Sequence, residues 1–178
     1  VRKAVTADFK KIGSCIFVVG KTRDEMGMSL LFRRFGGEQG AVPGVDVDAL
    51  KRYMDELLQA MDEGIVLSCH DCSDGGIAVA VAEMCISGHV GAEITLDGID
   101  GMDLRRKLYS ESNSRWIVEV DGMDVTRFTE IMGDDAVLLG ITKGDGLKIK
   151  DNGTFVPLDE MRRAWNDPIW NIMGGAAE

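Results

Sequence analysis

A largely polar stretch at residues 69–76 separates two apolar segments and constrains the fold more than any other part of the chain. Before it, residues 64–68 begin at a glycine break and contain β-branched side chains, which predicts a short buried strand. After it, residues 77–84 are almost entirely apolar with small side chains, which predicts a helix. A strand that turns through glycines into an apolar helix is typical of a sheet with helices packed against it.

The turn in this stretch is a candidate site for a metal ion and a phosphate. A helix N-terminus presents free backbone N–H groups that can bind an anion. Asp71 and Asp74 would repel a bare phosphate, so the hypothesis places a divalent cation between them, with Asp71 as metal ligand. The phosphate-binding residues would be Ser73, Asp74, Gly75 and Gly76. The alternative is a buried junction in which Ser73 or Asp74 only caps the helix.

A second polar run, residues 110–115, has no aliphatic side chain and precedes a predicted strand. The carboxylate of Glu111, the amide of Asn113 and the guanidinium of Arg115 could hydrogen-bond a polar ligand. Arg115 would suit a phosphate or a carboxylate, because its planar fork donates two parallel hydrogen bonds. The alternative is an ordinary polar turn.

Strand-like and helix-like segments alternate along the rest of the chain. Strands are predicted at 15–19, 92–96, 116–120 and 136–141, with a hairpin closed by Asn152-Gly153 at 147–156. Helices are predicted at 28–35, 46–63, 125–132 and 158–165, and a short one from about 102. This order indicates a sheet with helices packed against it, of the α/β (mixed α+β) class, in a single domain, residues 1–178.

Three further predictions concern helix ends and faces. Thr22 and Glu25 have the spacing of a capping box, which predicts a helix start at that point. The tail after Pro168 is predicted to be irregular. The helix at 46–63 is predicted to bury one apolar face, formed by Val47, Leu50, Met54, Leu57, Leu58 and Met61.

Charge and hydropathy exclude two classes of partner. The formal net charge is −10 with the acidic residues spread along the 178-residue chain, whereas a nucleic-acid backbone requires clustered Lys and Arg. No apolar run approaches the roughly 20 residues of a membrane helix, so we expect no membrane partner and a cytoplasmic location. There is no signal-peptide pattern, and the start at Val1 predicts processing or, more simply, a piece cut from a longer protein.

Side chains for nucleophilic or redox catalysis are sparse. The four cysteines lie in apolar or strand-like surroundings, which favours buried reduced thiols. Cys69 and Cys72 form a C-x-x-C without a second pair at zinc spacing, so a redox-active pair is the alternative. No nucleophile elbow, P-loop or dinucleotide fingerprint is present. The residues themselves therefore indicate a ligand-binding domain and name no reaction.

Several motifs, in the same order along the chain, resemble the large subunit of phosphoribosylformylglycinamidine synthase. The longest are HDCSDGGIAVA at 70–80, followed by AEM at 82–84, and LYSESNSR at 108–115. Shorter matching segments lie at 4–6, 8–10, 20–29, 42–43 and 163–165. The family often has Phe in place of Tyr109 and Gln in place of Asn113. The resemblance covers essentially the whole chain.

The resemblance implies a layered α/β/α domain with a mixed sheet, like the C-terminal domain of aminoimidazole ribonucleotide synthetase. The family's long chain resembles two tandem pairs of domains, each an ATP-binding-type half followed by such a C-terminal half. This chain is similar to the second C-terminal half. The implied activity is that of an ATP-dependent ligase of purine synthesis, which converts formylglycinamide ribonucleotide to its amidine with Mg²⁺, ATP and ammonia from glutamine.

The resemblance also implies partners and site residues. The partners are the ATP-binding-type half of the same chain, a glutaminase subunit and a small bridging subunit, and the isolated piece is expected to be inactive. By analogy with the first C-terminal half, Asp71 is associated with Mg²⁺, and Glu111, Ser112 and Asn113 with substrate. The family's catalytic histidine lies in a half absent here, so His70 does not take that role.

Two alternatives remain open at this point. One is another enzyme of the superfamily: aminoimidazole ribonucleotide synthetase, selenophosphate synthetase, thiamine monophosphate kinase or a hydrogenase maturation factor. The other is a non-catalytic scaffold domain that packs against its twin in the longer chain.

Overall fold

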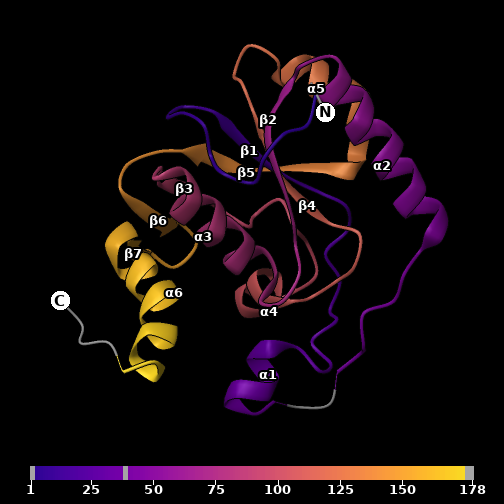
Figure 1. Cartoon of the computed structure of the whole chain (residues 1–178). Coiled ribbons are helices and arrows are strands. Elements are labelled where there is room, and N and C mark those ends of the chain that lie inside the picture. The colour runs from indigo at the N-terminus through magenta and orange to yellow at the C-terminus, as the bar shows by residue number, and fades with distance from the viewer. Residues whose placement is uncertain (1–2, 38–39, 175–178) are drawn as a thin grey trace.

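A computed structural model describes residues 3–37 and 40–174 of the chain, and Figure 1 shows how its elements are arranged. In this part of the chain, seven strands form one sheet in the order β2-β4-β1-β5-β3-β6-β7. Neighbouring strands are antiparallel except β3 and β6, which run parallel, so the sheet is mixed. The strands are β1 Cys15–Val19, β2 Val66–Asp71, β3 Ala92–Ile94, β4 Trp116–Val120, β5 Ala136–Thr142, β6 Gly146–Ile149 and β7 Thr154–Pro157.

Helices cover both faces of the sheet and make three layers. The larger core lies between the sheet and α3, α4 and α6, and the smaller one between the sheet and α2 and α5. Because successive strand residues point to opposite faces, Ile16 and Val18 enter the larger core, and Phe17 and Val19 the smaller. The helices are α1 Leu30–Phe35, α2 Val47–Asp62, α3 Gly76–Gly88, α4 Leu104–Tyr109, α5 Val125–Met132 and α6 Leu158–Ile172, with the short 3-10 helix η1 Gly133–Asp135.

This architecture confirms the predicted α/β/α layering and most of the predicted elements. α2 begins where Asp46 accepts a hydrogen bond from the backbone N–H of Ala49 at 3.0 Å. The chain then leaves the helix through Gly64, whose φ of 77° suits glycine. The hairpin of β6 and β7 turns through Asn152 and Gly153 as predicted. Within the described residues, no helix is both long and apolar enough to span a membrane.

The predicted apolar face of α2 is confirmed at Leu57 and Met61 and wrong at three other positions. The side chains that α2 buries are Ala49, Tyr53, Leu57 and Ala60. Val47, Met54 and Leu58, which were expected in the core, are 69%, 47% and 56% exposed. The two alanines explain the difference, because small side chains let the helix lie close to the sheet and rotate the contact stripe toward them. A pattern based on large apolar residues does not register such a stripe.

The predicted capping box at Thr22 and Glu25 is also wrong. Both side chains take partners elsewhere: Thr22 accepts a hydrogen bond from Arg115 at 2.9 Å, and Glu25 accepts one from the Gly44 N–H at 3.1 Å. The first helix instead begins at Leu30, where Ser29 accepts a hydrogen bond from the Phe32 N–H. α1 buries none of its side chains and lies apart from the sheet in Figure 1.

The ends of β2 and α6 differ from the predicted ones. β2 continues to Asp71 instead of ending at Ser68, because it pairs with β4 as far as Asp71 opposite Trp116. α6 passes through Pro168 and ends at Ile172, so the irregular tail was predicted too early. Pro168 removes a hydrogen bond from an exposed part of the helix, where water can satisfy the freed carbonyl. Residues 175–178 lie outside the described residues.

Phe128 tests the smaller core. Its ring is fully buried and lies 5.0 Å from that of Phe17, so Phe128→Ala removes an aromatic contact between α5 and the sheet. We expect a loss of about 3–5 kcal/mol in the free energy of unfolding, measured by urea denaturation. Met123→Ala, at a side chain that is 86% exposed, is the control and should change this free energy by less than about 0.5 kcal/mol. Equal losses in both variants would contradict the assignment of this core.

Candidate functional site

The pairing of β2 with β4 brings the two polar stretches together. Asp71 at the end of β2 lies opposite Trp116 at the start of β4, and the Cys72 N–H donates to the Arg115 carbonyl at 2.9 Å. The turn that follows β2 and the loop that precedes β4 therefore lie side by side. Between them is a cavity of about 450 Å³, a size that suits a small ligand.

Six of the predicted site residues line this cavity. They are Asp71, Ser73, Asp74, Glu111, Asn113 and Arg115. Asp71, Ser73, Asp74 and Asn113 are exposed and present their polar groups to the solvent side. An apolar part of the wall comes from Pro43, which lies in one of the shorter matching segments, and from Val45, Leu50 and Trp116, which were not predicted as site residues.

A carboxylate of the chain itself lies at the N-terminus of α3. Glu111 Oε1 accepts hydrogen bonds from the Gly75 N–H at 2.9 Å and from the Leu30 N–H at 2.8 Å. Gly75 is the N-cap residue, in a left-handed conformation, and the side chains of Ser73 and Asp74 make no capping hydrogen bond. The alternative that Ser73 or Asp74 caps α3 is therefore wrong. Glu111 instead joins α3, the start of α1 and the second polar loop.

Arg115 is buried and stabilises the second polar loop. It is 1% exposed, and its guanidinium donates to the carbonyls of Ser110 and Ser112 and to the Thr22 hydroxyl. No carboxylate of the described residues lies within ion-pair distance of it. Burial lowers the pKa of the Arg115 guanidinium, because the charged form loses its hydration. Its hydrogen bonds hold the loop in shape instead of pointing at a ligand.

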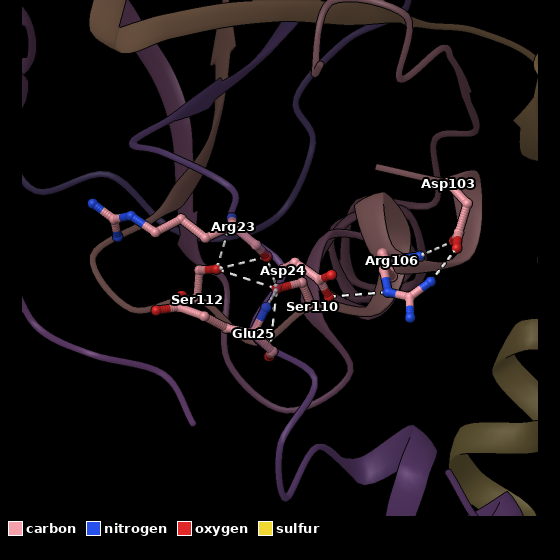
Figure 2. A network of polar contacts seen from close by, with 7 residues as sticks. All are labelled: Arg23, Asp24, Glu25, Asp103, Arg106, Ser110 and Ser112. Atoms are coloured by element: carbon pink, nitrogen blue, oxygen red, sulfur yellow. Dashed lines mark hydrogen bonds and ion pairs between the residues drawn. The ribbon is translucent and has the colours of Figure 1, made fainter. Parts of the chain in front are cut away.

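Ser112 is buried, does not line the cavity, and belongs to a polar network with residues 23–25 (Figure 2). The Arg23 N–H donates to the Ser112 hydroxyl at 3.0 Å, and the Arg23 carbonyl accepts hydrogen bonds from the hydroxyls of Ser110 and Ser112. The buried serines therefore fasten an extended segment of the chain to the second polar loop. The sequence analysis associated Ser112 with a substrate, but it did not predict these hydrogen bonds to Arg23.

Gly75 and Gly76 shape the turn without lining the cavity. Gly76 has a φ of 63°, and a Cβ there would lie 2.4 Å from the Ser110 carbonyl oxygen. The backbone of α3 can therefore approach the second polar loop only at a residue without a side chain. The glycine motif serves close packing between the two stretches.

No preformed metal cage is present among the described residues, since they contain no group of three or more His, Cys, Asp and Glu side chains that could hold an ion. The Asp71 side chain is 67% exposed, and His70, 3.5 Å from it through Nδ1, is held by Glu83 at 2.6 Å through Nε2. Mg²⁺ commonly binds through one or two carboxylates together with ligand phosphates and water. The exposed carboxylates of Asp71 and Asp74 fit that mode.

The cysteines are free thiols and unsuited to redox chemistry. Burial raises the pKa of Cys69 to about 12 and that of Cys72 to about 11. Burial also raises the pKa of Cys85 to about 12 and increases that of Cys15. Because the thiolate is the reactive form, the C-x-x-C lacks the low pKa of redox-active pairs. This favours the prediction of reduced thiols.

Residues 11–152 match the family described as AIR synthase related protein, C-terminal domain. The chain belongs to this family. It is 33% identical to the phosphoribosylformylglycinamidine synthase subunit PurL of Lactobacillus delbrueckii subsp. bulgaricus over 172 residues, which are 95% of this chain and 23% of that protein. The predicted resemblance is thus confirmed, and the chain spans about a quarter of the length of the curated relatives that it matches.

Solved structures share the fold. Thermotoga maritima PurL complexed with FGAR has a TM-score of 0.78 at 20% identity, covering 90% of this chain and 30% of that one. The same protein complexed with ATP has a TM-score of 0.74, at 20% identity and with 90% and 27% coverage. Escherichia coli HypE, a hydrogenase maturation protein, has a TM-score of 0.64 at 19% identity, with 86% and 51% coverage. At these identities the likeness establishes the fold of the AIR synthase related domain.

Gly76→Ala tests the close approach of the two stretches. The new methyl group would clash with the Ser110 carbonyl and force an L-residue into a positive φ, so we expect a loss of more than about 2 kcal/mol in the free energy of unfolding. Urea denaturation measures it. Gly122→Ala is the matched control, because its Cβ would meet nothing within 4 Å. A stable Gly76→Ala variant would show that the backbones need not touch.

Alkylation tests the thiols. At pH 8 we expect iodoacetamide to modify Cys69, Cys72 and Cys85 far more slowly in the native protein than in urea, because little thiolate forms when the pKa is raised. Peptide mass spectrometry over time resolves each site, and labelling should accelerate as the pH rises toward these pKa values. Rapid labelling of Cys69 or Cys72 in the native protein at pH 8 would contradict the raised pKa values and support a redox-active pair.

Proposed function

We propose that this chain is the C-terminal domain of a phosphoribosylformylglycinamidine synthase. The reaction is the ATP-dependent joining of ammonia from glutamine to formylglycinamide ribonucleotide, which gives the amidine, ADP and phosphate in de novo purine synthesis. The observation that carries this proposal is the identity to a curated PurL along 95% of the chain. Residues 1–178 would form one domain of this longer ligase, in the cytoplasm.

Activity would require the other parts of the enzyme. The chain corresponds to about a quarter of the length of its relatives, and neither polar stretch has a hydroxyl or thiol bonded to a histidine in the described part. The ATP-binding-type half would supply the catalytic residues, and the glutaminase and small bridging subunits would deliver ammonia. The isolated domain is expected to bind ligand without turning it over.

The cavity between the two polar stretches would hold a nucleotide through Mg²⁺. The Asp71 carboxylate, with Asp74 beside it, would bind the ion, and the ion would neutralise the repulsion between these carboxylates and phosphate oxygens. Ser73, Asp74 and Asn113 would hydrogen-bond the ligand, because their side chains are exposed to the cavity. Gly75, Gly76, Glu111, Ser112 and Arg115 would hold the wall in shape.

A scaffold role is the second candidate, and one observation favours it. Glu111 occupies the N–H of Gly75 and Arg115 uses its donors on the chain itself, so two of the groups expected to meet a ligand are already satisfied. A scaffold domain that binds no ligand and only packs against its neighbour would have the same hydrogen bonds. Nucleotide binding separates the two candidates.

Asp71→Asn tests the metal-dependent site. The substitution keeps the size of the side chain and removes its charge, so we expect calorimetry with ADP and excess Mg²⁺ to show at least about tenfold weaker binding. Asp100→Asn, at an exposed aspartate outside the cavity, should bind like the unmodified chain. Absence of any heat with the unmodified chain at millimolar ADP, together with binding by the full-length synthase, would favour the scaffold.

A further inference from the structure

The cavity wall is short of free positive charge. Its charged lining consists of Asp71, Asp74, Glu111 and Arg115. The guanidinium of Arg115 is buried and hydrogen-bonded to the chain on three sides, so it has little capacity left for a ligand. A bound Mg²⁺ would offset the two exposed aspartates, but a phosphorylated ligand brings further negative charge. A cationic side chain from outside the lining would complete the balance.

The segment from Gly20 to Arg23 runs directly along this wall. A Cβ at Gly20 would lie 2.2 Å from the Ser114 carbonyl oxygen, and Thr22 accepts a hydrogen bond from Arg115. One residue further, both backbone groups of Arg23 are bonded to the serines of the second polar loop. These contacts hold the main chain of Arg23 in place while its side chain takes no part in them.

The Arg23 side chain is exposed and unpaired. Figure 2 shows its guanidinium extended away from Ser110 and Ser112, whereas Arg106 in the same view is bonded to Asp24 and Asp103. Within the described residues, Arg23 makes no ion pair or side-chain hydrogen bond. Among the basic side chains around the second polar loop, it is therefore one that is available to a ligand.

Arg23 does not itself line the cavity, but its main chain is bonded to the loop that does, and its charge acts on groups near the wall. Burial is the main cause of the lowered pKa of Arg115, and the positive charge of Arg23 lowers it further. Burial likewise raises the pKa of Tyr53, and Arg23 acts in the opposite direction. Arg115 lines the cavity and Tyr53 lies one helical turn after Leu50, another lining residue. The side chain of Arg23 therefore starts from a main chain that is fixed against the cavity wall, and its charge acts on groups on both sides of that point.

We propose that Arg23 binds the phosphate of a phosphorylated ligand in the cavity, a nucleotide or a sugar phosphate. The inference rests on the proposed function for the cavity itself and adds the residue that would recognise the anion. A guanidinium recognises phosphate through two parallel hydrogen bonds, and a main chain that is already fixed reduces the entropy lost when the side chain orders. Residues 22–25, which were predicted to form a capping box, would then be a ligand-binding segment.

Calorimetry on the chain with ADP and Mg²⁺ tests this role. We expect Arg23→Gln to weaken binding at least about tenfold and Arg23→Lys, which keeps the charge but loses the fork, to weaken it less. Arg33→Gln removes the same charge from an exposed arginine of α1 outside this cavity and should stay within about twofold of the unmodified chain. Thermal denaturation should give the same midpoint for Arg23→Gln, because only the main chain of Arg23 holds the fold.

Two further titrations define the ligand and separate this inference from the function on which it rests. If ribose 5-phosphate binds with the same loss in Arg23→Gln but inorganic phosphate does not bind, the site takes sugar phosphates. Normal binding of ADP by Arg23→Gln, with loss in Asp71→Asn, would overturn the role of Arg23 and leave the metal site standing. If the unmodified chain binds none of the three compounds, both the role of Arg23 and the nucleotide site are overturned.

Discussion

The antiparallel pairing of β2 with β4 is the constraint on which the site depends. Its ladder runs as far as Asp71 opposite Trp116 and continues in the hydrogen bond from the Cys72 N–H to the Arg115 carbonyl. Two loops that are about forty residues apart in the sequence therefore leave the sheet at the same edge. A slip of one residue would turn Asp71 to the other face of the sheet and separate it from the second loop. The cavity is thus a consequence of strand register.

Arg115 explains how so polar a loop can be ordered beside a core. Burying a guanidinium carries a penalty of several kcal/mol, which hydrogen bonds and nearby charges must offset. Here the two serine carbonyls and the Thr22 hydroxyl accept its hydrogen bonds, and Glu25 and Glu111 favour its charge from a greater distance. Its removal would leave buried acceptors without donors, so Arg115 would matter for stability whether or not the cavity binds a ligand.

The sequence predicted those features that depend on neighbouring residues alone, such as strands, helix ends and tight turns. The strands, the Asp46 cap of α2, the Gly64 exit and the hairpin at Asn152 follow from residue type and spacing. Their order gives the α/β class, and the layering came from the family resemblance. The two polar stretches could be recognised as candidates, but their meeting depends on strand order, which a single sequence leaves open. The use of Thr22, Glu25 and Glu111 was not predictable, because their partners lie 19 to 93 positions away.

The polar groups of the site are of two kinds: some are hydrogen-bonded to the chain itself, and others are exposed and free to bind a ligand. Glu111, Ser112 and Arg115 bond to the chain and fix the wall, whereas Asp71, Asp74 and Asn113 stay exposed. Because the Glu111 carboxylate already accepts from the N–H of the N-cap residue Gly75, an anion at the N-terminus of α3 would meet a negative charge and would be attracted mainly by charges that lie outside it. A cation on the aspartates and the guanidinium of Arg23 are the two sources that the geometry offers. Anion binding in this cavity would consequently depend on Mg²⁺ and weaken as salt screens the exposed charges.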